Sequence, residues 1–315
     1  MKLITPKIPE YKELEKGIKE ILKTKQLTTG KYTKLVEEEI KKIHGCKYSL
    51  LVSSGTTAFM LLLSAVNKFY KHKETICQDF TWESVKHLVL LMAASPPSFC
   101  DINKDTWLAE EPTNKEALFI PNMTFGNCIT YKHKKTIYDS SHCLGNPICN
   151  GRGYGEIISF SPAKMISACE GGCIITNNKK IYDECLWLRQ YHGRISELNA
   201  LFLYHNLKNL DKEIERKVEI DIKYMEGFGN ESFYSWTYDK ENWCNIPNEF
   251  VYTNPKMNDK IRKKLSEVFD IRLRYKPTEK DNKNSWYIYN HQIVLPQVGG
   301  EKQKEVIKKL NEICK

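Results

Sequence analysis

Residues 159–172 read SFSPAKMISACEGG and lie between two short β-branched runs, residues 157–158 and 174–176. The runs predict two strands, and the proline and paired glycines of the stretch predict a fixed turn between them. Lys164 lies on this turn. A lysine held between apolar strands can lose contact with water, which lowers its pKa and frees the neutral amine that Schiff-base chemistry needs. An ordinary surface lysine is the alternative, and this residue taken alone favours it.

The composition is that of a globular protein with a large core. The chain has 315 residues, of which 41% are hydrophobic and 28% charged. This length suits one large domain, or a large domain with a small one. No window approaches the roughly 20 continuous apolar residues of a membrane span. The N-terminus carries no apolar signal region, so we expect a cytoplasmic protein that does not act at a membrane.

The charge and the cysteines exclude several classes of site. The net charge of +9 comes from lysines spread along the chain rather than clustered with aromatic residues, so nucleic-acid binding is a weak alternative. A basic surface also suits a substrate that carries phosphates. The eleven cysteines form no CxxC pair, which favours reduced thiols. Cys143, Cys149, Cys169 and Cys173 lie near the proposed site but match no zinc spacing, so we expect no metal site.

Strands and helices alternate in the first half of the chain. We expect helices at 10–25, between Gly30 and Gly45, at 53–70 and at 85–92, and strands at 48–52, 76–77, 98–102, 118–121 and 136–138. Such repeated units predict an α/β fold with three layers around a mostly parallel sheet. In that fold, ligands gather at the carboxyl ends of the strands.

A small-residue turn opens the helix predicted at 53–70. The sequence Ser53-Ser-Gly-Thr-Thr-Ala58 follows a strand directly. Strand, turn and helix in this order present free backbone N–H groups to an anion, and the helix dipole favours negative charge there. Thr56 and Thr57 add hydroxyl donors. A helix cap without a ligand is the alternative.

Two further groups follow predicted strands. Asp139 ends the strand at 136–138, and His142 comes three residues later. Trp82 follows the strand at 76–77. Each has an ordinary alternative: a turn residue for Asp139, a buried histidine with satisfied hydrogen bonds for His142, and a core aromatic for Trp82.

The last third of the chain mixes strands and helices. A long helix is predicted at 206–228, strands at 249–252, 271–275 and 291–295, and helices at 259–269 and 301–314. We therefore expect a large α/β domain at residues 1–205. A long connecting helix and a smaller α+β domain would make up residues 206–315.

Seven short runs follow one another along nearly the whole chain. They are 27–30 (LTTG), 53–58 (SSGTTA), 98–106 (SFCDINKDT), 138–142 (YDSSH), 159–164 with 170–172 (SFSPAK and EGG), 194–200 (RISELNA) and 293–296 (IVLP). In this order they resemble motifs of the DegT/DnrJ family of sugar aminotransferases, which depend on pyridoxal 5'-phosphate (PLP). From the second run on, the family motifs are SGTAA, VFVDID-DT, EDAAH, SFHPTK with GEGG, RMSELQA and ILSLP. The resemblance implies a fold-type-I PLP-dependent transferase.

The resemblance implies chemical roles for three residues. Lys164 would bind the cofactor covalently and carry a proton between the substrate carbon and the cofactor. Asp139 would pair with the pyridinium nitrogen and keep it protonated. His142 would form a hydrogen bond near the 3-oxygen of the ring.

The resemblance also implies binding contacts. Trp82 would stack on the pyridine face. The cofactor phosphate would be held by Gly55, Thr56, Thr57 and Ser159.

The chain departs from the family pattern in three places. The loop that in the family ends in Asn-Tyr-Arg is almost gone between Gly193 and Arg194, and His192-Gly-Arg194 stands in its place. The family Asn reaches the cofactor of a partner subunit, so we expect a homodimer in which His192 or Arg194 takes over that contact. The stretch after Gly126 is also short, and Ser161 and Cys169 replace the usual His and Gly.

The implied activity is transfer of an amino group from an amino acid, with glutamate as the expected donor, to a nucleotide-linked keto-deoxysugar. The product would be an amino sugar for a surface glycan or a glycosylated metabolite, and the cofactor would alternate between PLP and its amine form (PMP). Arg274, Tyr275 and Lys276, in a family-like RxxYxP region, are candidate substrate contacts. A keto-inositol is an alternative substrate, and a non-catalytic relative is an alternative class. Sugar dehydratases of the family carry His where Lys164 stands, which argues against that chemistry.

Overall fold

The computed structural model describes residues 1–4, 6–228, 233–234 and 245–314. Within them, a four-stranded and a three-stranded sheet are joined by the isolated bridges Phe119–Thr136 and Asn122–Asp139. The resulting central sheet has the strand order β1 (Tyr48–Val52), β7 (Gly172–Thr176), β6 (Gly155–Ser159), β5 (Ile137–Asp139), β4 (Leu118–Ile120), β2 (Thr75–Gln78) and β3 (Pro97–Cys100).

The sheet is mostly parallel, as predicted. Strand β7 runs antiparallel to β1 and to β6, whereas β5 is parallel to β6 and β2 is parallel to β3 and to β4. The bridges between β4 and β5 are parallel as well. Because parallel strands end at the same edge, the residues after β2, β5 and β6 are brought together there.

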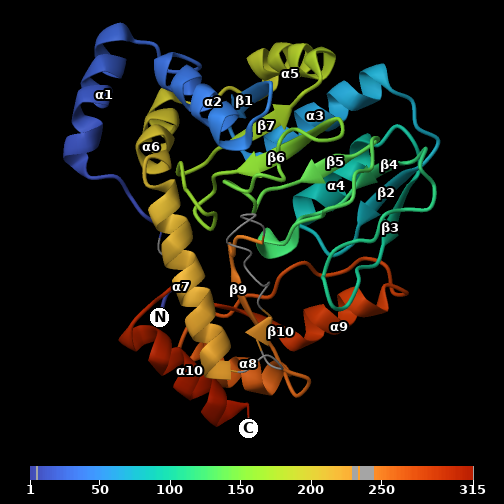
Figure 1. Cartoon of the computed structure of the whole chain (residues 1–315), viewed down its shortest axis with the longest axis vertical. Coiled ribbons are helices and arrows are strands. Elements are labelled where there is room, and N and C mark those ends of the chain that lie inside the picture. The colour runs from blue at the N-terminus through green and yellow to red at the C-terminus, as the bar shows by residue number, and fades with distance from the viewer. Residues whose placement is uncertain (5, 229–232, 235–244, 315) are drawn as a thin grey trace.

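Side-chain alternation along the strands divides the core into two layers. Ile157 and Ile174 face a cluster with α3 (Gly55–Phe69), α4 (Glu83–Met92) and α5 (Lys179–His192). Ile158 and Ile175 face the opposite cluster with α1 (Tyr11–Thr24), α2 (Lys31–His44) and α6 (Glu197–Leu207). Helices thus cover both faces of the sheet, which confirms the predicted three layers (Figure 1).

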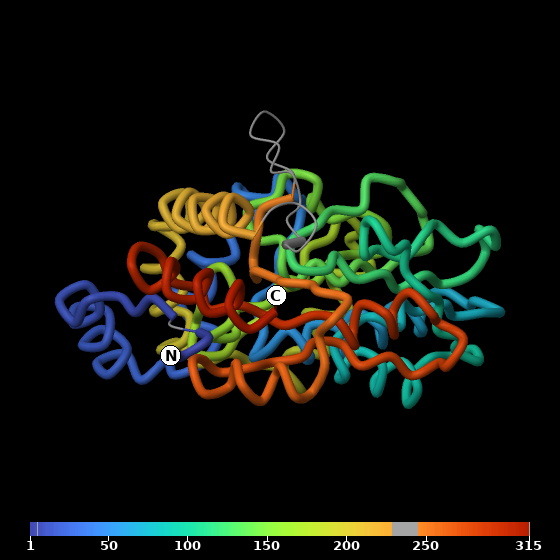
Figure 2. Tube along the Cα trace, turned by 90° about the horizontal axis from the view of Figure 1, so that it is seen from below, coloured from blue at the N-terminus to red at the C-terminus, as the bar shows by residue number. Residues whose placement is uncertain are grey.

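The C-terminal part has a hydrophobic core of its own. Helix α7 (Leu210–Phe228) leads into an antiparallel sheet of β8 (Phe233–Tyr234), β9 (Phe250–Thr253) and β10 (Gln292–Leu295). Helix α10 (Glu301–Ile313) packs on α7 and on α8 (Asp259–Ser266) (Figure 2). The N-terminus joins this part, because the Met1 ammonium donates to the Val268 carbonyl (2.8 Å). A boundary between residues 205 and 206 remains a prediction.

Two predicted elements differ in the structure. The helix predicted at 206–228 begins at Leu210, because α6 ends at Leu207 and the Asn206 side chain donates to the Ser167 carbonyl (2.8 Å). The strand predicted at 271–275 is wrong. That segment makes one backbone bond to β10, from the Val294 N–H to the Arg272 carbonyl, and Tyr275 takes a φ of 60° that no extended strand permits.

Two carboxylates, one buried and one half-buried, fasten the C-terminal part to the edge of the central sheet. Asp79, just after β2, accepts hydrogen bonds from the N–H groups of Thr278 and Glu279. Asp101, just after β3, accepts from the N–H groups of Asn284 and Ser285, at the start of α9 (Lys283–His291). Both carboxylates therefore follow strands whose ends define the ligand-binding edge.

Glu197 performs a similar task at the start of α2. Its carboxylate is buried and accepts from the N–H groups of Gly30 (2.8 Å), Tyr32 (2.8 Å) and Thr33 (3.0 Å). These are N–H groups that a helix leaves without partners in its own first turn. The motif residues 27–30 and 194–200 therefore act as one structural unit.

Among the described residues, no helix is both long and apolar enough to traverse a lipid bilayer.

We expect Glu197→Ala to lower the free energy of unfolding by about 2–4 kcal/mol, because three buried N–H groups lose a charged acceptor at once. Urea unfolding followed by circular dichroism measures the change. Glu219→Ala is the matched control, since Glu219 pairs with Lys223 on the solvent face of α7 and should leave the midpoint unchanged. Equal midpoints for the two variants would contradict the assigned role of Glu197.

Candidate active site

A cavity of about 550 Å³ lies at the carboxyl ends of the central strands, against the C-terminal part. It brings together many of the residues that the sequence singles out. The predicted residues that line it are Gly55, Thr56, Trp82, Asp139, His142, Ser159, Lys164, Arg274 and Tyr275.

Lys164 lies in the connection between β6 and β7, as predicted. The Lys164 N–H donates to the Ser161 carbonyl (3.0 Å), and Ala168 N–H closes the loop onto the Phe160 carbonyl (2.9 Å). Burial lowers the pKa of the Lys164 ammonium to about 8, although the nearby carboxylates of Glu249 and Asp139 act in the opposite direction. A substantial share of the amine is therefore neutral near pH 8.

The turn after Lys164 shows how one departure from the family pattern is accommodated. Cys169 has a φ of 64°, in the left-handed region that glycine adopts more readily than other residues. Its N–H donates to the Ser167 hydroxyl (3.2 Å). The family glycine at this position thus meets a backbone requirement that this chain satisfies with a strained cysteine.

Asp139 projects into the cavity from the end of β5. Its backbone N–H donates to the Pro121 carbonyl (2.9 Å), which fixes the strand end, and the Ser141 N–H donates to Oδ1 (3.1 Å). Burial raises the pKa of this carboxyl above its usual value. A buried carboxylate with few donors is stabilised by a cation placed beside it, which is the partner a pyridinium nitrogen provides.

His142 is held as a neutral imidazole. The Phe125 N–H donates to Nδ1 (3.0 Å), so the ring carries its proton on Nε2, which lies 3.3 Å from the Tyr275 hydroxyl. Burial lowers the pKa of His142 well below its usual value, and the positive charge of Lys164 adds to the effect. The ring lies beside both Phe125 and Tyr275, whose own centroids are 5.4 Å apart, and this cluster of three rings restricts its rotation.

The start of α3 has the strand–turn–helix geometry on which the predicted anion site depends. The Ser54 hydroxyl accepts from the Thr57 N–H (3.0 Å), while the N–H groups of Gly55 and Thr56 belong to the first turn at the cavity wall. Ser159 lies opposite, so close that a Cβ on Gly55 would stand 3.0 Å from the Ser159 Cβ. A Cβ on Gly172 would fall 2.3 Å from the Ser54 carbonyl oxygen, so the final glycine of the EGG run is required where β7 passes this turn.

Thr57 differs from its predicted position. Its hydroxyl bonds to the hydroxyls of Ser53 (3.1 Å) and Ser54 (2.9 Å), and the residue is not part of the cavity lining. It therefore supports the turn from behind.

Glu249 is the site residue that the sequence reasoning did not find. It lies just before β9 in the cavity wall and accepts from Arg274 Nε (3.0 Å), with both side chains buried. Arg274 also lies 5.9 Å from the ring centroid of Trp82. The sequence signal that could have indicated it is an acidic residue placed directly before the apolar run of β9. Arg274 is thus held by an internal partner.

The remaining predicted residues lie outside the cavity lining. Lys276 is exposed and contributes its carbonyl to the Lys86 ammonium. His192 and Arg194 are exposed on either side of Gly193, whose carbonyl accepts from the Ser53 N–H (3.0 Å). That bond places both side chains next to the α3 turn, on the outside of the chain.

These groups fit PLP by their chemistry. The cavity offers a helix N-terminus for a phosphate, a buried carboxylate for a protonated ring nitrogen and a lysine that is partly neutral. A half-exposed tryptophan at the same wall offers a flat surface for a ring.

Comparison with known proteins agrees with this geometry. The sequence model described as the DegT/DnrJ/EryC1/StrS aminotransferase family matches residues 10–118 and 132–311. The chain belongs to this family. The segment 119–131, which contains the end of β4 and the chain after it, lies outside the match.

Two curated proteins are similar to this chain over part of their length. The UDP-4-amino-4,6-dideoxy-N-acetyl-beta-L-altrosamine transaminase of Helicobacter pylori (strain ATCC 700392 / 26695) is 27% identical over 59% of this chain and 54% of that protein. The transaminase of the same name from Campylobacter jejuni is 26% identical over 68% of this chain and 66% of that protein. The chain thus matches about half to two thirds of the length of these relatives.

Solved structures show the same fold over the whole chain. Helicobacter pylori PseC, described as an aminotransferase involved in the biosynthesis of pseudoaminic acid, has a TM-score of 0.84 at 20% identity, over 99% of this chain and 98% of that one. The likeness confirms the predicted fold, that of fold-type-I PLP-dependent transferases.

We expect Lys164 of the cofactor-free chain to react with acylating reagents with an apparent pKa of about 8, because burial disfavours its charged form. Competitive labelling across pH, read by mass spectrometry, measures this value. Lys179 is the internal control, since its hydrogen bond to Asp183 raises its pKa and should delay its labelling to more alkaline pH. Glu249→Gln should shift the Lys164 profile further to acid. Identical profiles for the two lysines would contradict the burial argument.

Proposed function

We propose that this chain is a PLP-dependent aminotransferase that moves an amino group from an amino acid, with glutamate as donor, to a keto-deoxysugar linked to a nucleotide. The observation that carries the proposal is the meeting of Lys164, Asp139 and the start of α3 in one cavity. The chain belongs to an aminotransferase family, and its curated relatives are named as transaminases of nucleotide-linked amino sugars.

When bound, PLP supplies an electron-withdrawing ring that stabilises negative charge at the substrate carbon. Lys164 would hold the cofactor and, as a partly neutral amine, take up and return the proton of that carbon. Asp139 would keep the ring nitrogen protonated. His142 would present a neutral Nε2–H donor, and its stacked position prevents the ring from turning away.

The basic residues of the cavity suit a substrate with phosphates. Arg274 is occupied by Glu249, whereas Arg272 is exposed and also lines the cavity. Arg272 would therefore be the cation for the diphosphate of a nucleotide sugar. A keto-inositol carries no diphosphate, so affinity that depends on Arg272 separates the two substrate classes.

We expect the purified chain with PLP to absorb in the visible range. Without an acceptor it should convert one equivalent of glutamate to 2-oxoglutarate, and a nucleotide-linked keto-deoxysugar should then allow repeated turnover. Lys164→Ala should lose the covalent link and about a hundredfold to ten-thousandfold or more of turnover. Borohydride treatment should fix the cofactor mass on the peptide that contains Lys164.

Asp139→Asn is the informative comparison for this test. It should still bind PLP but slow the glutamate half-reaction by about a hundredfold to a thousandfold, since an amide does not hold the nitrogen proton. A chain without visible absorbance would favour the non-catalytic relative. Labelling of another lysine would refute the assignment of Lys164.

We expect a cytoplasmic homodimer in which His192 or Arg194 reaches the partner subunit's cofactor phosphate. Both side chains are exposed beside the α3 turn, where a second subunit can bring them to a neighbouring site. Loss of such a contact should weaken PLP binding by about tenfold to a hundredfold.

Sedimentation of the wild type and PLP titration of His192→Ala and Arg194→Ala test the dimer. Lys260→Ala, on the exposed face of α8, is the control and should bind PLP normally. A monomer that binds PLP fully would refute the shared site, as would unaltered affinity in both variants.

A further inference from the structure

Glu249 occupies only one edge of the Arg274 guanidinium in the wall of the active-site cavity. Its carboxylate accepts from Arg274 Nε (3.0 Å) and from Nη2. Nη1 has no acceptor among the described residues, and it keeps some contact with solvent although the side chain is only 9% exposed. Because Arg274 lines the cavity, Nη1 is the part of this side chain that is free to bind a ligand.

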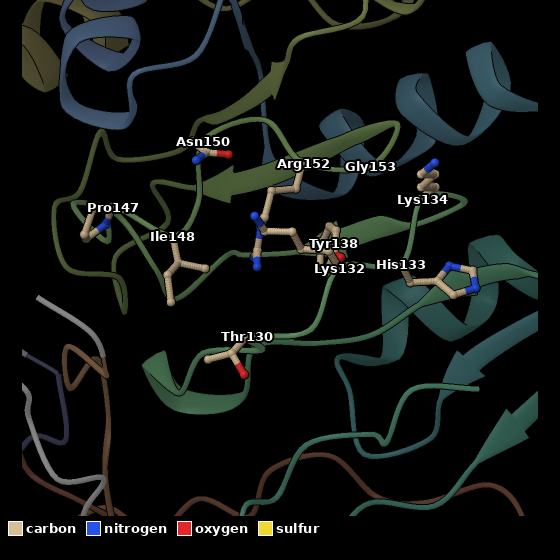
Figure 3. Close-up of a pocket in the computed structure, with 10 residues that line it drawn as sticks. All are labelled: Thr130, Lys132, His133, Lys134, Tyr138, Pro147, Ile148, Asn150, Arg152 and Gly153. Carbon is tan, nitrogen blue, oxygen red and sulfur yellow. The ribbon is translucent and has the colours of Figure 1, made fainter. Parts of the chain in front are cut away.

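Arg152 is a second arginine with the same kind of carboxylate pair, and all three of its nitrogens are occupied. It lies in the wall of another cavity, of about 690 Å³ (Figure 3). Its Nε and Nη2 bond to Glu156 (3.3 and 3.2 Å), and its Nη1 donates to the Ile129 carbonyl (2.7 Å). Such complete pairing is what a structural arginine requires. Arg274 is buried to the same degree but lacks the third acceptor.

Arg274 lies where the amino-acid donor has a carboxylate. The donor carries its α-carboxylate on the carbon whose proton Lys164 would move, so a cation that binds this group must lie near Lys164. Burial lowers the pKa of Lys164, and the positive charge of Arg274 adds to this effect, so the guanidinium is within electrostatic reach of the amine. The guanidinium is also 5.9 Å from the ring centroid of Trp82, which would stack on the cofactor.

The pair with Glu249 favours a carboxylate over a diphosphate at Arg274. Glu249 keeps a negative charge beside the guanidinium, and this charge repels a doubly charged group more than a singly charged one. Arg272 is exposed, lines the same cavity and makes no ion pair with the described carboxylates. A diphosphate, which is large and strongly hydrated, is therefore better suited to Arg272.

We propose that Arg274, held by Glu249, binds a carboxylate of the amino-acid donor through Nη1, while Arg272 binds the diphosphate of the acceptor. This assignment rests on the proposed aminotransferase function. Charge-assisted hydrogen bonds from a fixed guanidinium give orientation as well as affinity, so Arg274 would turn the reacting carbon of the donor toward Lys164. Glu249 is then a positioning residue, because it acts on the donor through Arg274.

Isothermal titration of the PLP-loaded chain with glutarate and with uridine diphosphate tests this division. Glutarate has the two carboxylates of glutamate but no amine, so it binds without reacting. We expect Arg274→Lys to weaken glutarate binding by about tenfold to a hundredfold, since lysine keeps a charge beside Glu249 but has no Nη1 donor. The affinity for uridine diphosphate should remain that of the wild type. Arg272→Gln should show the reverse pattern.

Two further variants control for folding. The double variant Arg274→Gln/Glu249→Gln removes both charges together, so that neither is left buried alone, and it should also lose glutarate binding. Arg152→Lys alters a buried arginine–carboxylate pair outside the active-site cavity and should bind both probes like the wild type.

The proposal is overturned if glutarate does not bind the wild type, or if Arg274→Lys and the double variant bind it as the wild type does. It is also overturned if Arg274→Lys weakens both probes equally. A wild type that binds glutarate through Arg274 but does not bind uridine diphosphate would support the donor site and count against a nucleotide-linked acceptor.

Discussion

Carboxylates that accept backbone N–H groups from distant segments are the interaction on which the rest of this structure depends. Asp79 and Asp101 hold residues 278–285 against the ends of β2 and β3, and Glu197 fixes the start of α2. Each carboxylate accepts several hydrogen bonds, which offset the free-energy cost of removing its charge from water. Because these contacts join segments far apart in sequence, they determine how closely the C-terminal part approaches the sheet edge, and so the shape of the candidate active site.

Asp139 contrasts with these structural carboxylates. Among the described residues, Ser141 alone donates to its carboxylate, and burial accordingly raises its pKa. Burial also disfavours the charged form of Lys164, and it lowers the pKa of this lysine to about 8. The two groups face one cavity without pairing fully with each other. A ligand with a cationic nitrogen would stabilise the buried Asp139 carboxylate, and its electrophilic carbon would react with the neutral Lys164 amine. This gives a physical reason for the cofactor that the family uses.

The sequence could predict what depends on local pattern. The alternation of strands and helices, the turn at Gly55 and the position of Lys164 between β6 and β7 follow from residue spacing. Features that depend on contacts between distant residues could not be predicted from the sequence. The Arg274–Glu249 pair joins residues 25 positions apart, and Tyr275 leaves the extended region where a strand was predicted. Thr57 lies outside the cavity lining, because a motif alone does not show which side of a helix turn faces the cavity.

The period of two along β5 separates the candidate active site from the unusual connection between β4 and β5. Ile137 packs under α3 and Asp139 faces the active-site cavity from the same side, whereas Tyr138 belongs to the core cluster on the other face. Residues 121–136 contain a short 3₁₀ turn in place of the crossover helix that ordinarily joins parallel strands. The ion pair of Arg152 and Glu156 anchors the Ile129 carbonyl and the Gly151 N–H there. Because neighbouring residues of β5 point to opposite faces, this connection leaves the side of Asp139 unaffected.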